Sequence, residues 1–448
     1  GHCRVRSLAQ SSTGFVSTHL WSDVRTFSAV AKTSTNTEVK HNTDVLIVGG
    51  GVVGCSLAHQ LSMRAPDLSV GIVEARGGPS LSKEQPSHVP NPRSYALSPY
   101  SLRLLDMEGP SSNSRLGYYS SMQVWESGHP ASLLFSDKDI PEGTNLGAVV
   151  EDETIVKHLW GKVQEKCHIF TNATVSDINL PDTSTSGLAS VQLQSAADKD
   201  ATSGQQLNHI SVQTKLLIGA DGANSIVRRL AGISRTVLEY DQHALTFTVK
   251  LNGPHRKRAF QRFLPTGPIA LLPTFLDDHS IVVWSTTPAI AREWKNNPNL
   301  VNHVNSLLQD GPERLNSLFE TSSAAQLPPP LANLLYGAEK VVELAQYGPA
   351  MLAQEKTGSF MPPPVIDAVV SPQFSFPLSC AQVSSYSAPR LALAGDAAHS
   401  VHPMAGQGLN LGLQDVGNLI EVVMKAQNSG MDVSTFLDEY DTSRKLQV

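Results

Sequence analysis

The chain has 448 residues, of which 40% are hydrophobic and 17% are charged, and its formal net charge is −6. This composition is typical of a globular protein, and the length favours two domains. The acidic balance and the lack of a long Lys/Arg run argue against nucleic-acid binding. The sequence has no run of 18 apolar residues, so no membrane-spanning helix is expected. The four cysteines form no CxxC pair, which argues against a zinc site or a disulfide framework.

Residues 1–43 differ in composition from the rest of the chain. They contain five basic residues, two acidic residues and 14 Ser or Thr, without the apolar core of a secretory signal. This composition is typical of an organelle transit peptide, and the mitochondrion is the first choice. The alternative is a disordered tail that carries no targeting information.

The chain after this segment is predicted to begin with a β-α-β unit. The apolar run 44–48 predicts a buried parallel strand, residues 53–61 show helical spacing, and residues 69–73 predict a second strand that ends at Glu74. The polar stretch 182–207 predicts a hairpin tip or an insertion. The sequence also predicts a loop over 76–92, helices over 98–107 and 152–165, and strands over 123–126, 132–135 and 213–219.

The second half of the chain changes pattern and then returns to the first one. Residues 240–290 alternate between apolar and polar as antiparallel strands do, and residues 290–345 are helical in pattern. Residues 356–373 are Pro-rich and are predicted to be irregular. A buried strand over 390–394 then precedes a Gly-rich turn and a helix over 409–426.

These patterns predict an α/β fold whose parallel sheet is built from both ends of the chain and is interrupted by an antiparallel sheet. The first part of the α/β domain is predicted over 44–235, the antiparallel domain over 236–386, and the last part of the α/β domain over 387–448.

A glycine motif follows the first strand. Gly49 allows a tight turn, Gly51 lets the backbone approach a pyrophosphate, and Gly54 lets the helix pack closely on the sheet. The start of the helix offers unpaired N–H groups to phosphates. Glu74 lies 20 residues after Gly54, where a carboxylate accepts hydrogen bonds from ribose hydroxyls and disfavours a 2′-phosphate. A Rossmann-type dinucleotide site is therefore predicted, with an unliganded glycine turn as the alternative.

Two further motifs follow later strands. The second runs from Gly219 through Asp221 and Gly222 to Arg228, and the third runs from Gly395 to Asn410. In the third, Asp396 can accept from a sugar or ribityl hydroxyl, and the Gly-rich loop can approach a flat ring. The paired histidines of this loop, His399 and His402, lack a third ligand at metal-site spacing, so hydrogen bonding is expected of them and no metal.

The three motifs in this order resemble those of the single-component FAD-dependent aromatic hydroxylases. Within that group the chain most resembles the mitochondrial ubiquinone-biosynthesis monooxygenases. That likeness rests on Gln261-Arg-Phe-Leu-Pro-Thr-Gly-Pro-Ile-Ala-Leu-Leu-Pro273, on the Lys215–Gly222 segment, and on Asp396-Ala-Ala-His399 with Pro403 and Gly406-Gln-Gly408. The resemblance implies a Rossmann-type FAD-binding domain interrupted by an antiparallel-sheet substrate domain.

The resemblance also implies roles for particular residues, although it implies no catalytic acid or base. The FAD-binding set is Gly49, Gly51, Gly54, Glu74, Arg93, Asp221, Gly395, Asp396, Pro403, Gly406, Gln407 and Gly408. The expected substrate wall is the strand that carries Phe263, Gly267, Pro268 and Leu272. The aromatics Phe263 and Trp284 are candidates for the pocket, with sheet core as the equal alternative.

The implied substrate is a polyprenylated hydroxybenzoate or phenol, and the implied electron donor is NAD(P)H or a ferredoxin with its reductase. The resemblance further implies peripheral attachment to the matrix face of the mitochondrial inner membrane, among other ubiquinone-biosynthesis proteins. Two alternatives stay open: an epoxidase or prenyl reductase of the same fold, and an inert FAD-bound scaffold. The chain stops at Val448 in mid-pattern, which suggests a truncated C-terminus.

Overall fold

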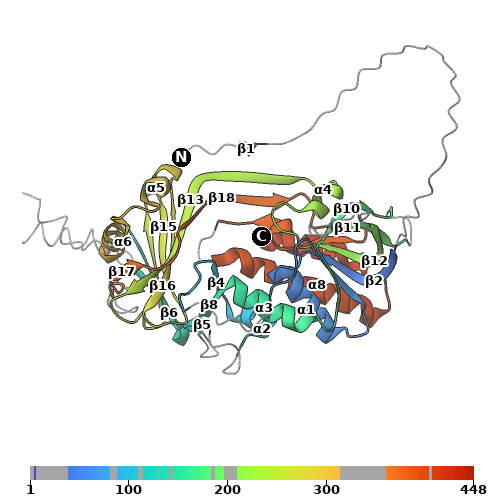
Figure 1. Cartoon of the computed structure of the whole chain (residues 1–448), viewed down its shortest axis with the longest axis horizontal. Helices are drawn as coiled ribbons and strands as arrows, with labels where there is room; N and C mark the ends of the chain where they lie inside the picture. Colours follow the sequence, from blue (N-terminus) through green and yellow to red (C-terminus); the bar gives the residue numbers. More distant parts are fainter. Residues whose placement is uncertain are drawn as a thin grey trace, which may run out of the picture.

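The computed structural model shows two halves joined by two long strands (Figure 1). It describes residues 5–6, 39–80, 88–108, 115–130, 132–140, 145–182, 187–195, 209–312, 360–402 and 406–448. Among the sequence predictions, Pro403 and most of 1–43, 182–207 and 313–359 lie outside these ranges.

The first half is built on a mostly parallel sheet. Its central strand β2 (Val39–Val48) lies between β12 (His209–Gly219) and β3 (Val70–Glu74), and all three are parallel. Residues 45–48 of β2 are at most 5% exposed, because helices cover one face and strands flank both edges. The remaining strands of the sheet are β9 (His168–Thr171), β10 (Ala173–Asn179), β11 (Ala189–Ser195), β19 (Ser387–Ala388) and β20 (Leu391–Leu393).

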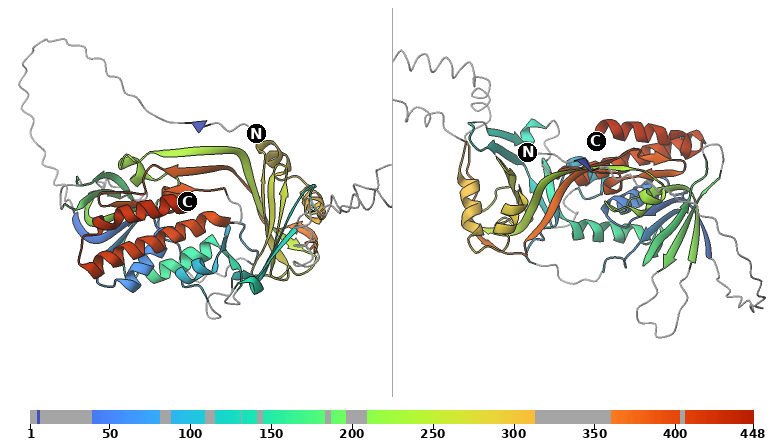
Figure 2. Two further views of the ribbon diagram at one scale, coloured as in Figure 1. Left: turned by 180° about the vertical axis from the view of Figure 1, so that it is seen from behind. Right: turned by 90° about the horizontal axis from the view of Figure 1, so that it is seen from above.

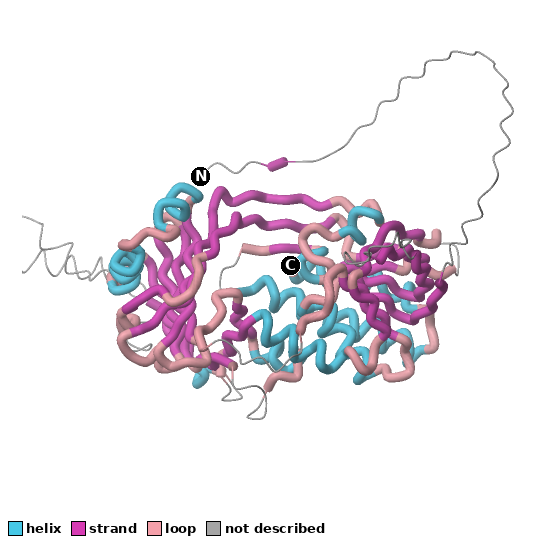
Figure 3. Tube along the Cα trace, viewed as in Figure 1, coloured by secondary structure: helices cyan, strands magenta, loops and turns pink. Residues whose placement is uncertain are grey.

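Helices from both ends of the chain cover this sheet. Figure 3 shows α1 (Val52–Arg64), α3 (Asp152–Val163) and α8 (Gln407–Ser429) gathered in the first half, and α1 packs against both of the others. The longest, α8, begins at Gly406 and ends at Gly430, two glycines with positive φ. The shorter helical segments here are α2 (Pro99–Leu104), α4 (Ile226–Leu230), α9 (Leu437–Gln447), η4 (Gly395–Ala397) and η6 (Val433–Phe436).

The second half is a large, mainly antiparallel sheet with helices on its outer face. Its strands follow the order β21-β18-β13-β16-β15-β14-β6-β7. Their bounds are β6 (Ser121–Glu126), β7 (Ser132–Ser136), β13 (Arg235–Leu251), β14 (Arg258–Leu264), β15 (Gly267–Pro273), β16 (His279–Thr286), β18 (Phe374–Val383) and β21 (His399–Ser400). The short β1 (Val5–Arg6) and β17 (Ile366–Val369) pair with β13, and η1 (Asp137–Asp139) follows β7.

The outer face of this sheet forms a separate hydrophobic core. Trp125, Phe247 and Trp284 pack there with α5 (Pro288–Trp294) and α6 (Leu300–Gln309). The long strands β13 and β18 run from this core to the parallel half (Figure 2). A small third sheet of β4 (Ser94–Leu97), β8 (Gly147–Glu151) and β5 (Leu116–Tyr119) lies between the two larger ones.

Three features differ from the sequence predictions. The first strand begins at Val39 rather than Asp44, because residues 39–43 pair in parallel with β12. Strands β6 and β7 fall inside the predicted 44–235 segment but pair with the antiparallel sheet through β14. The prediction that 356–373 is irregular was wrong for β17, which pairs with the end of β13 despite the neighbouring prolines.

Candidate functional site

The three glycine turns meet at one edge of the parallel sheet. The Ala220 N–H donates to the Val48 carbonyl at 2.8 Å, and the Ala394 N–H donates to the Gly219 carbonyl at 2.9 Å. The Gly49 N–H bonds the end of β3 in the same way. Because these strands are parallel, the bonds join their carboxyl ends into one surface. This is the edge at which α/β proteins bind ligands.

The glycines of the first turn serve two different purposes. A Cβ on Gly49, whose φ is +116°, would lie 2.2 Å from the Ala220 carbonyl oxygen. A Cβ on Gly54 would lie 2.0 Å from the Gly49 carbonyl oxygen, so the fold itself requires both glycines. A Cβ on Gly51 would meet no atom of the described chain within 4 Å. Since α1 has no side-chain cap at Gly51, its first N–H groups face this open space.

Glu74 lies beside this turn, at the end of β3. One carboxylate oxygen accepts from the Gly50 N–H at 2.8 Å, and the other accepts from the Arg76 N–H at 3.0 Å. The Trp160 indole donates to the Gly50 carbonyl at 2.9 Å, so Gly50 is held on both sides. A carboxylate has about four acceptor sites, which leaves Glu74 able to accept from ribose hydroxyls as well.

Asp221 caps the helix that follows the second turn. One of its oxygens accepts from the N–H groups of Ile226 (2.6 Å) and Val227 (3.3 Å). Its other oxygen, Oδ1, is buried and has no hydrogen-bond partner within the described chain. Leaving a buried acceptor unpaired costs free energy, so this atom suits a ligand donor. Arg228 links this turn to the third one through a 2.8 Å hydrogen bond to the Ala397 carbonyl.

Asp396 lies on the third turn, directly after Gly395. Its side chain is exposed, yet desolvation by the surrounding protein raises its pKa, while His399 and Arg235 act in the opposite direction. The Arg235 Nε is buried and unpaired among the described residues. This turn can therefore receive a polar, hydroxyl-bearing ligand.

The start of α8 forms the opposite wall of the same surface. Gly406 has a φ of +65°, and a Cβ there would lie 3.1 Å from the Ala96 Cβ. The Asn410 amide donates to the Ala96 and Gly406 carbonyls at 2.8 and 2.9 Å, and its oxygen accepts from Ser98 and Ser101. Asn410 therefore holds the helix start against β4 and α2, a role that the motif alone did not reveal.

Gln407 and Gly408 form the first turn of α8. Gln407 is exposed, and the helix start has no side-chain cap. Unpaired N–H groups and partial positive charge therefore point out of the helix here, as a negatively charged ring would require.

A buried ionic network supports the third turn, and no sequence motif predicts it. Asp415 of α8 accepts from the Gly395 N–H and from His399 Nε2, both at 2.7 Å. Its other oxygen lies 2.5 Å from Arg444 Nε on α9, and Asp415 and Arg444 are both fully buried. His402 bonds Gln242 at 3.0 Å, so both loop histidines make hydrogen bonds as predicted. The described residues contain no group of three or more His, Cys, Asp or Glu suited to a metal ion.

The predicted substrate strand faces the parallel half with part of its length. Phe263 and Pro268 are register partners, and Leu272 and Ile281 pack against Ala96 and Val149 of the small sheet. Since directly opposite residues point to the same face, Phe374 and Phe376 of β18 lie on this face too. They are 49% and 45% exposed. Apolar side chains on this face thus extend from β14 to β18, interspersed with the polar Gln261, Thr246, Thr248 and Ser285.

Two of the sequence candidates have a structural role in the sheet itself. Trp284 is 2% exposed and packs in the outer core, so the core alternative holds for it. Gly267 has a φ of +136°, and a Cβ there would lie 2.5 Å from the Ser285 carbonyl oxygen. Its glycine is therefore explained by the hairpin turn and by close contact with β16.

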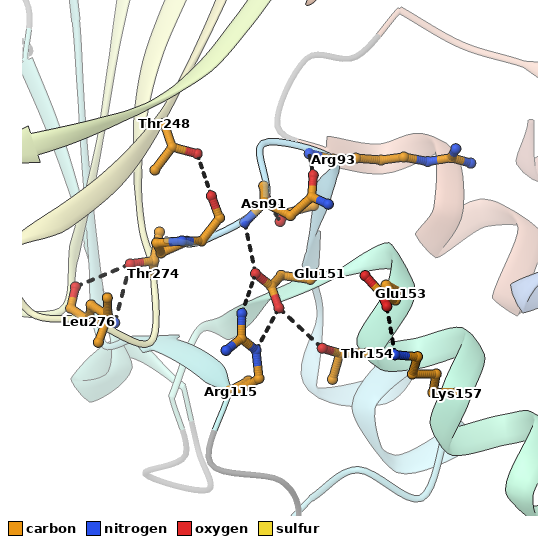
Figure 4. Close-up of polar contacts among 12 residues, drawn as sticks. Asn91, Arg93, Arg115, Glu151, Glu153, Thr154, Lys157, Thr248, Thr274 and Leu276 are labelled. Atoms are coloured by element: carbon orange, nitrogen blue, oxygen red, sulfur yellow. Dashed lines mark hydrogen bonds and ion pairs between the residues drawn. The ribbon is translucent and has the colours of Figure 1, made fainter. Parts of the chain in front are cut away.

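Arg93 lies at the start of β4, between the two halves. Its side chain is 71% exposed, and its Nε lies 3.2 Å from the Asp152 carboxylate. Figure 4 shows it extending away from the polar cluster around Glu151.

The edge as a whole fits FAD. It combines the open space at Gly51, a ribose acceptor at Glu74, an unpaired buried acceptor at Asp221 and a close-approach glycine at Gly406. Residues 361–448 match the family described as FAD binding domain, and residues 44–87 match the one described as lycopene cyclase protein. The second match spans only the first β-α-β unit.

Solved structures share the fold over most of the chain. PqsL, a probable FAD-dependent monooxygenase from Pseudomonas aeruginosa, has a TM-score of 0.61 at 19% identity and covers 90% of this chain and 92% of its own. The p-nitrophenol 4-monooxygenase PnpA from Pseudomonas putida has a TM-score of 0.56 at 18% identity, with 91% and 85% covered. The fold and site define an FAD-dependent protein of the aromatic-monooxygenase fold.

Sequence relatives narrow this class. The chain is 32% identical to the Caenorhabditis elegans protein named ubiquinone biosynthesis monooxygenase COQ6, mitochondrial, over 89% of this chain and 84% of that protein. It is 32% identical to the Homo sapiens protein of that name (90% and 81% covered) and 33% identical to that of Xenopus tropicalis (90% and 82%). The chain belongs to the ubiquinone-biosynthesis monooxygenase family and is an FAD-dependent monooxygenase. Within the described residues, no helix is long and apolar enough to cross a bilayer.

Proposed function

We propose that this chain hydroxylates the aromatic ring of a polyprenylated hydroxybenzoate or phenol intermediate of ubiquinone biosynthesis. The observation that carries the proposal is the apolar sheet face against the cofactor edge. Leu272 and Ile281 pack on Ala96, and Ala96 also contacts Gly406 at the start of α8. A ring held on this face would therefore lie between an apolar wall and the flavin turns. The name shared by the relatives supports a ubiquinone precursor.

The proposed cofactor contacts are those that the three sequence motifs and their resemblance predict. Gly49, Gly51, Gly54 and Glu74 hold the ADP half, and Arg93 reaches the diphosphate. The remaining contacts are Asp221 in the nucleotide region, Gly395 and Asp396 at the ribityl segment, and Pro403, Gly406, Gln407 and Gly408 around the ring system.

When bound, FAD takes two electrons from a donor and passes them to dioxygen, so that one oxygen atom enters the substrate ring and the other leaves as water. The chain positions the substrate ring and excludes water from it. Phe263, Pro268 and Leu272 form the proposed wall for the substrate, and their apolar surface excludes water from the ring. The uncapped start of α8 favours negative charge beside it. We assign no acid or base to the protein.

The proposed setting is the matrix face of the mitochondrial inner membrane, with peripheral attachment and other ubiquinone-biosynthesis proteins nearby. The relatives' names support a mitochondrial location, and the composition of residues 1–43 is that of a transit peptide. We propose NAD(P)H or a ferredoxin with its reductase as the donor. The proposed FAD-binding segments are 44–235 and 387–448, and the proposed substrate domain is 236–386 together with β6 and β7, which pair with its sheet.

The test has two stages. The purified chain is expected to show flavin absorption and to release FAD on denaturation, as identified by mass spectrometry. With a donor system, ¹⁸O₂ and a prenylated 4-hydroxybenzoate, it is expected to give a product with one ¹⁸O on the ring. An epoxide or a saturated prenyl chain would instead indicate an epoxidase or a prenyl reductase. Bound FAD without donor-driven turnover would indicate a scaffold.

A further inference from the structure

The segment that carries Arg93 is held from both halves of the molecule. On one side, the Thr248 hydroxyl of β13 donates to the Pro90 carbonyl at 2.7 Å. On the other side, the Asn91 N–H donates to Glu151 at 2.7 Å, and the Asp152 N–H donates to the Arg93 carbonyl at 3.0 Å. Figure 4 shows the contact between Asn91 and Glu151, with the Arg93 side chain extending away from it. The backbone at Arg93 is therefore fixed while its guanidinium stays exposed.

Glu151 is the centre of this arrangement. It is 6% exposed, and its two oxygens accept from the Asn91 N–H, from Thr154 Oγ1 at 3.2 Å, and from both Arg115 Nε and Nη2 at 2.7 and 2.8 Å. All of its acceptor sites are thus filled by protein donors. The ion pair with Arg115 is bidentate, the geometry that fixes direction as well as charge.

Arg115 extends the connection to the substrate sheet. Its guanidinium carbon lies 4.1 Å from the centroid of the Phe275 ring, and Phe275 follows β15. A buried ion pair contributes little to stability compared with apolar residues, and its best-supported advantage is a fixed local geometry. Within the described part of the chain, the other donors to Glu151 are Asn91 and Thr154, neither of which belongs to a glycine turn.

We propose that Glu151 and Arg115 are positioning residues. They hold the backbone of Arg93 so that its guanidinium meets the diphosphate of FAD, and they link this orientation to the substrate sheet. The inference rests on the proposed role of Arg93. Glu151 itself touches no cofactor; it acts by holding the Asn91–Arg93 backbone. Loss of the pair lets this segment shift, and the exposed guanidinium then meets the diphosphate less often.

A double-mutant cycle on FAD affinity tests this. The chain is stripped of FAD and reloaded, and the Kd is measured by flavin fluorescence. Arg93→Met is expected to raise the Kd about tenfold or more, as loss of one charge-assisted contact would. Glu151→Gln keeps the shape but removes the negative charge and one of the two acceptor oxygens for the fork, and a rise of about fivefold is expected. In the Arg93→Met background, Glu151→Gln is expected to change the Kd by less than about twofold.

Two further variants make the cycle decisive. Arg115→Lys keeps the charge but loses the bidentate fork, and it replaces Glu151→Gln if that variant does not fold. Glu153→Gln is the matched control, because Glu153 lies two residues further along the chain, is exposed on α3, and pairs only with Lys157 among the contacts in Figure 4. Equal effects of Glu151→Gln with and without Arg93, or an unchanged Kd, would overturn the inference. A wild-type chain that binds no FAD would instead overturn the proposed function.

Discussion

The two walls of the proposed site are made of different material. The cofactor wall consists of backbone: glycine turns, unpaired N–H groups and carbonyls that meet at the ends of four strands. The facing wall consists of side chains on a sheet, from Phe263 through Leu272 to Phe376. Where two backbone segments meet, as at Gly49, the backbone wall cannot accept an added Cβ, whereas the side-chain wall accepts new shapes and is sensitive to polarity. This difference predicts which substitutions unfold the protein and which change only its affinity for the substrate.

Gly49→Ala is expected to have the largest effect. The new Cβ would lie 2.2 Å from the Ala220 carbonyl oxygen, and the φ of +116° is one that alanine avoids. Neither backbone segment can move away, so the cost is about 5 kcal/mol or more, a large share of the stability of an ordinary domain. Thermal unfolding and the flavin content of purified protein measure it. A soluble variant with the wild-type melting temperature would contradict the backbone explanation.

Gly51→Ala is the matched control for that variant. The Gly51 φ of −79° suits alanine, and the new Cβ would meet no described atom within 4 Å. The free energy of unfolding of the FAD-free protein is therefore expected to stay within about 0.5 kcal/mol of wild type. FAD affinity is expected to fall, because the methyl group occupies the space offered to the diphosphate. A wild-type FAD affinity would place the diphosphate elsewhere.

The backbone wall could be predicted from the sequence, because each part of it carries a local signal. Continuous apolar runs end at Val48, Gly219 and Leu393, and parallel strands bring such ends to one edge. The side chains behind the wall gave no such signal. Asp415, Arg444 and the Glu151–Arg115 pair are ordinary charged residues whose partners depend on how helices and strands pack. The sequence also could not predict that β6 and β7 join the second sheet, because this depends on a non-local pairing with β14.

Removing a buried side chain that supports the backbone wall is expected to cost somewhat less stability than the Cβ added by Gly49→Ala. Arg444→Met leaves the fully buried Asp415 without its ionic partner, and breaking a buried pair costs about 3–5 kcal/mol. Asp415 also holds the Gly395 N–H, so the third turn should loosen and FAD should dissociate faster. Denaturant unfolding and FAD release rates measure the two effects. Arg444→Met with wild-type values of both would show that α9 does not support the cofactor turn.

Low pH is expected to reduce the stability of the FAD-binding half, because His59 of α1 is buried there. Desolvation, followed by the charge of Lys162, lowers the pKa of the buried His59 to about 4 from 6.5. Because the folded pKa lies below the unfolded one, the stability is fully present above pH 6.5 and is lost as the pH falls towards 4. The loss is at most about 3 kcal/mol. Chemical unfolding at pH 7 and pH 4.5 measures it.

His59→Leu is expected to reduce this slope but not to remove it. Burial also lowers the pKa of His158, whose ring bonds the Leu105 carbonyl, and that group acts in the same direction. An unchanged slope in the variant would show that His59 is protonated in the folded protein.

The smallest effect is expected for substitutions in the side-chain wall. Such substitutions show which edge of the sheet, β18 or β7, contacts the prenyl chain. Phe376→Ala removes a ring that is 45% exposed, so stability should change by about 0.5 kcal/mol and FAD content not at all. We expect KM for a prenylated substrate to rise about fivefold, equivalent to about 1 kcal/mol of lost apolar contact, with kcat unchanged. A phenol without the prenyl chain should show no change.

Phe135→Ala provides the comparison, because Phe135 is 50% exposed on the same face at the opposite edge, on β7. The prenyl chain is expected to follow β18 rather than β7, since β18 pairs further along with β21, directly after the third cofactor turn. A ring bound at that turn lies closer to Phe376, so Phe135→Ala should leave KM unchanged. If Phe135→Ala raised KM and Phe376→Ala did not, the chain would leave by the β7 edge. If neither variant raised KM, the prenyl chain would contact neither edge of the sheet. The side-chain wall would then contact only the substrate ring, at the centre of the sheet.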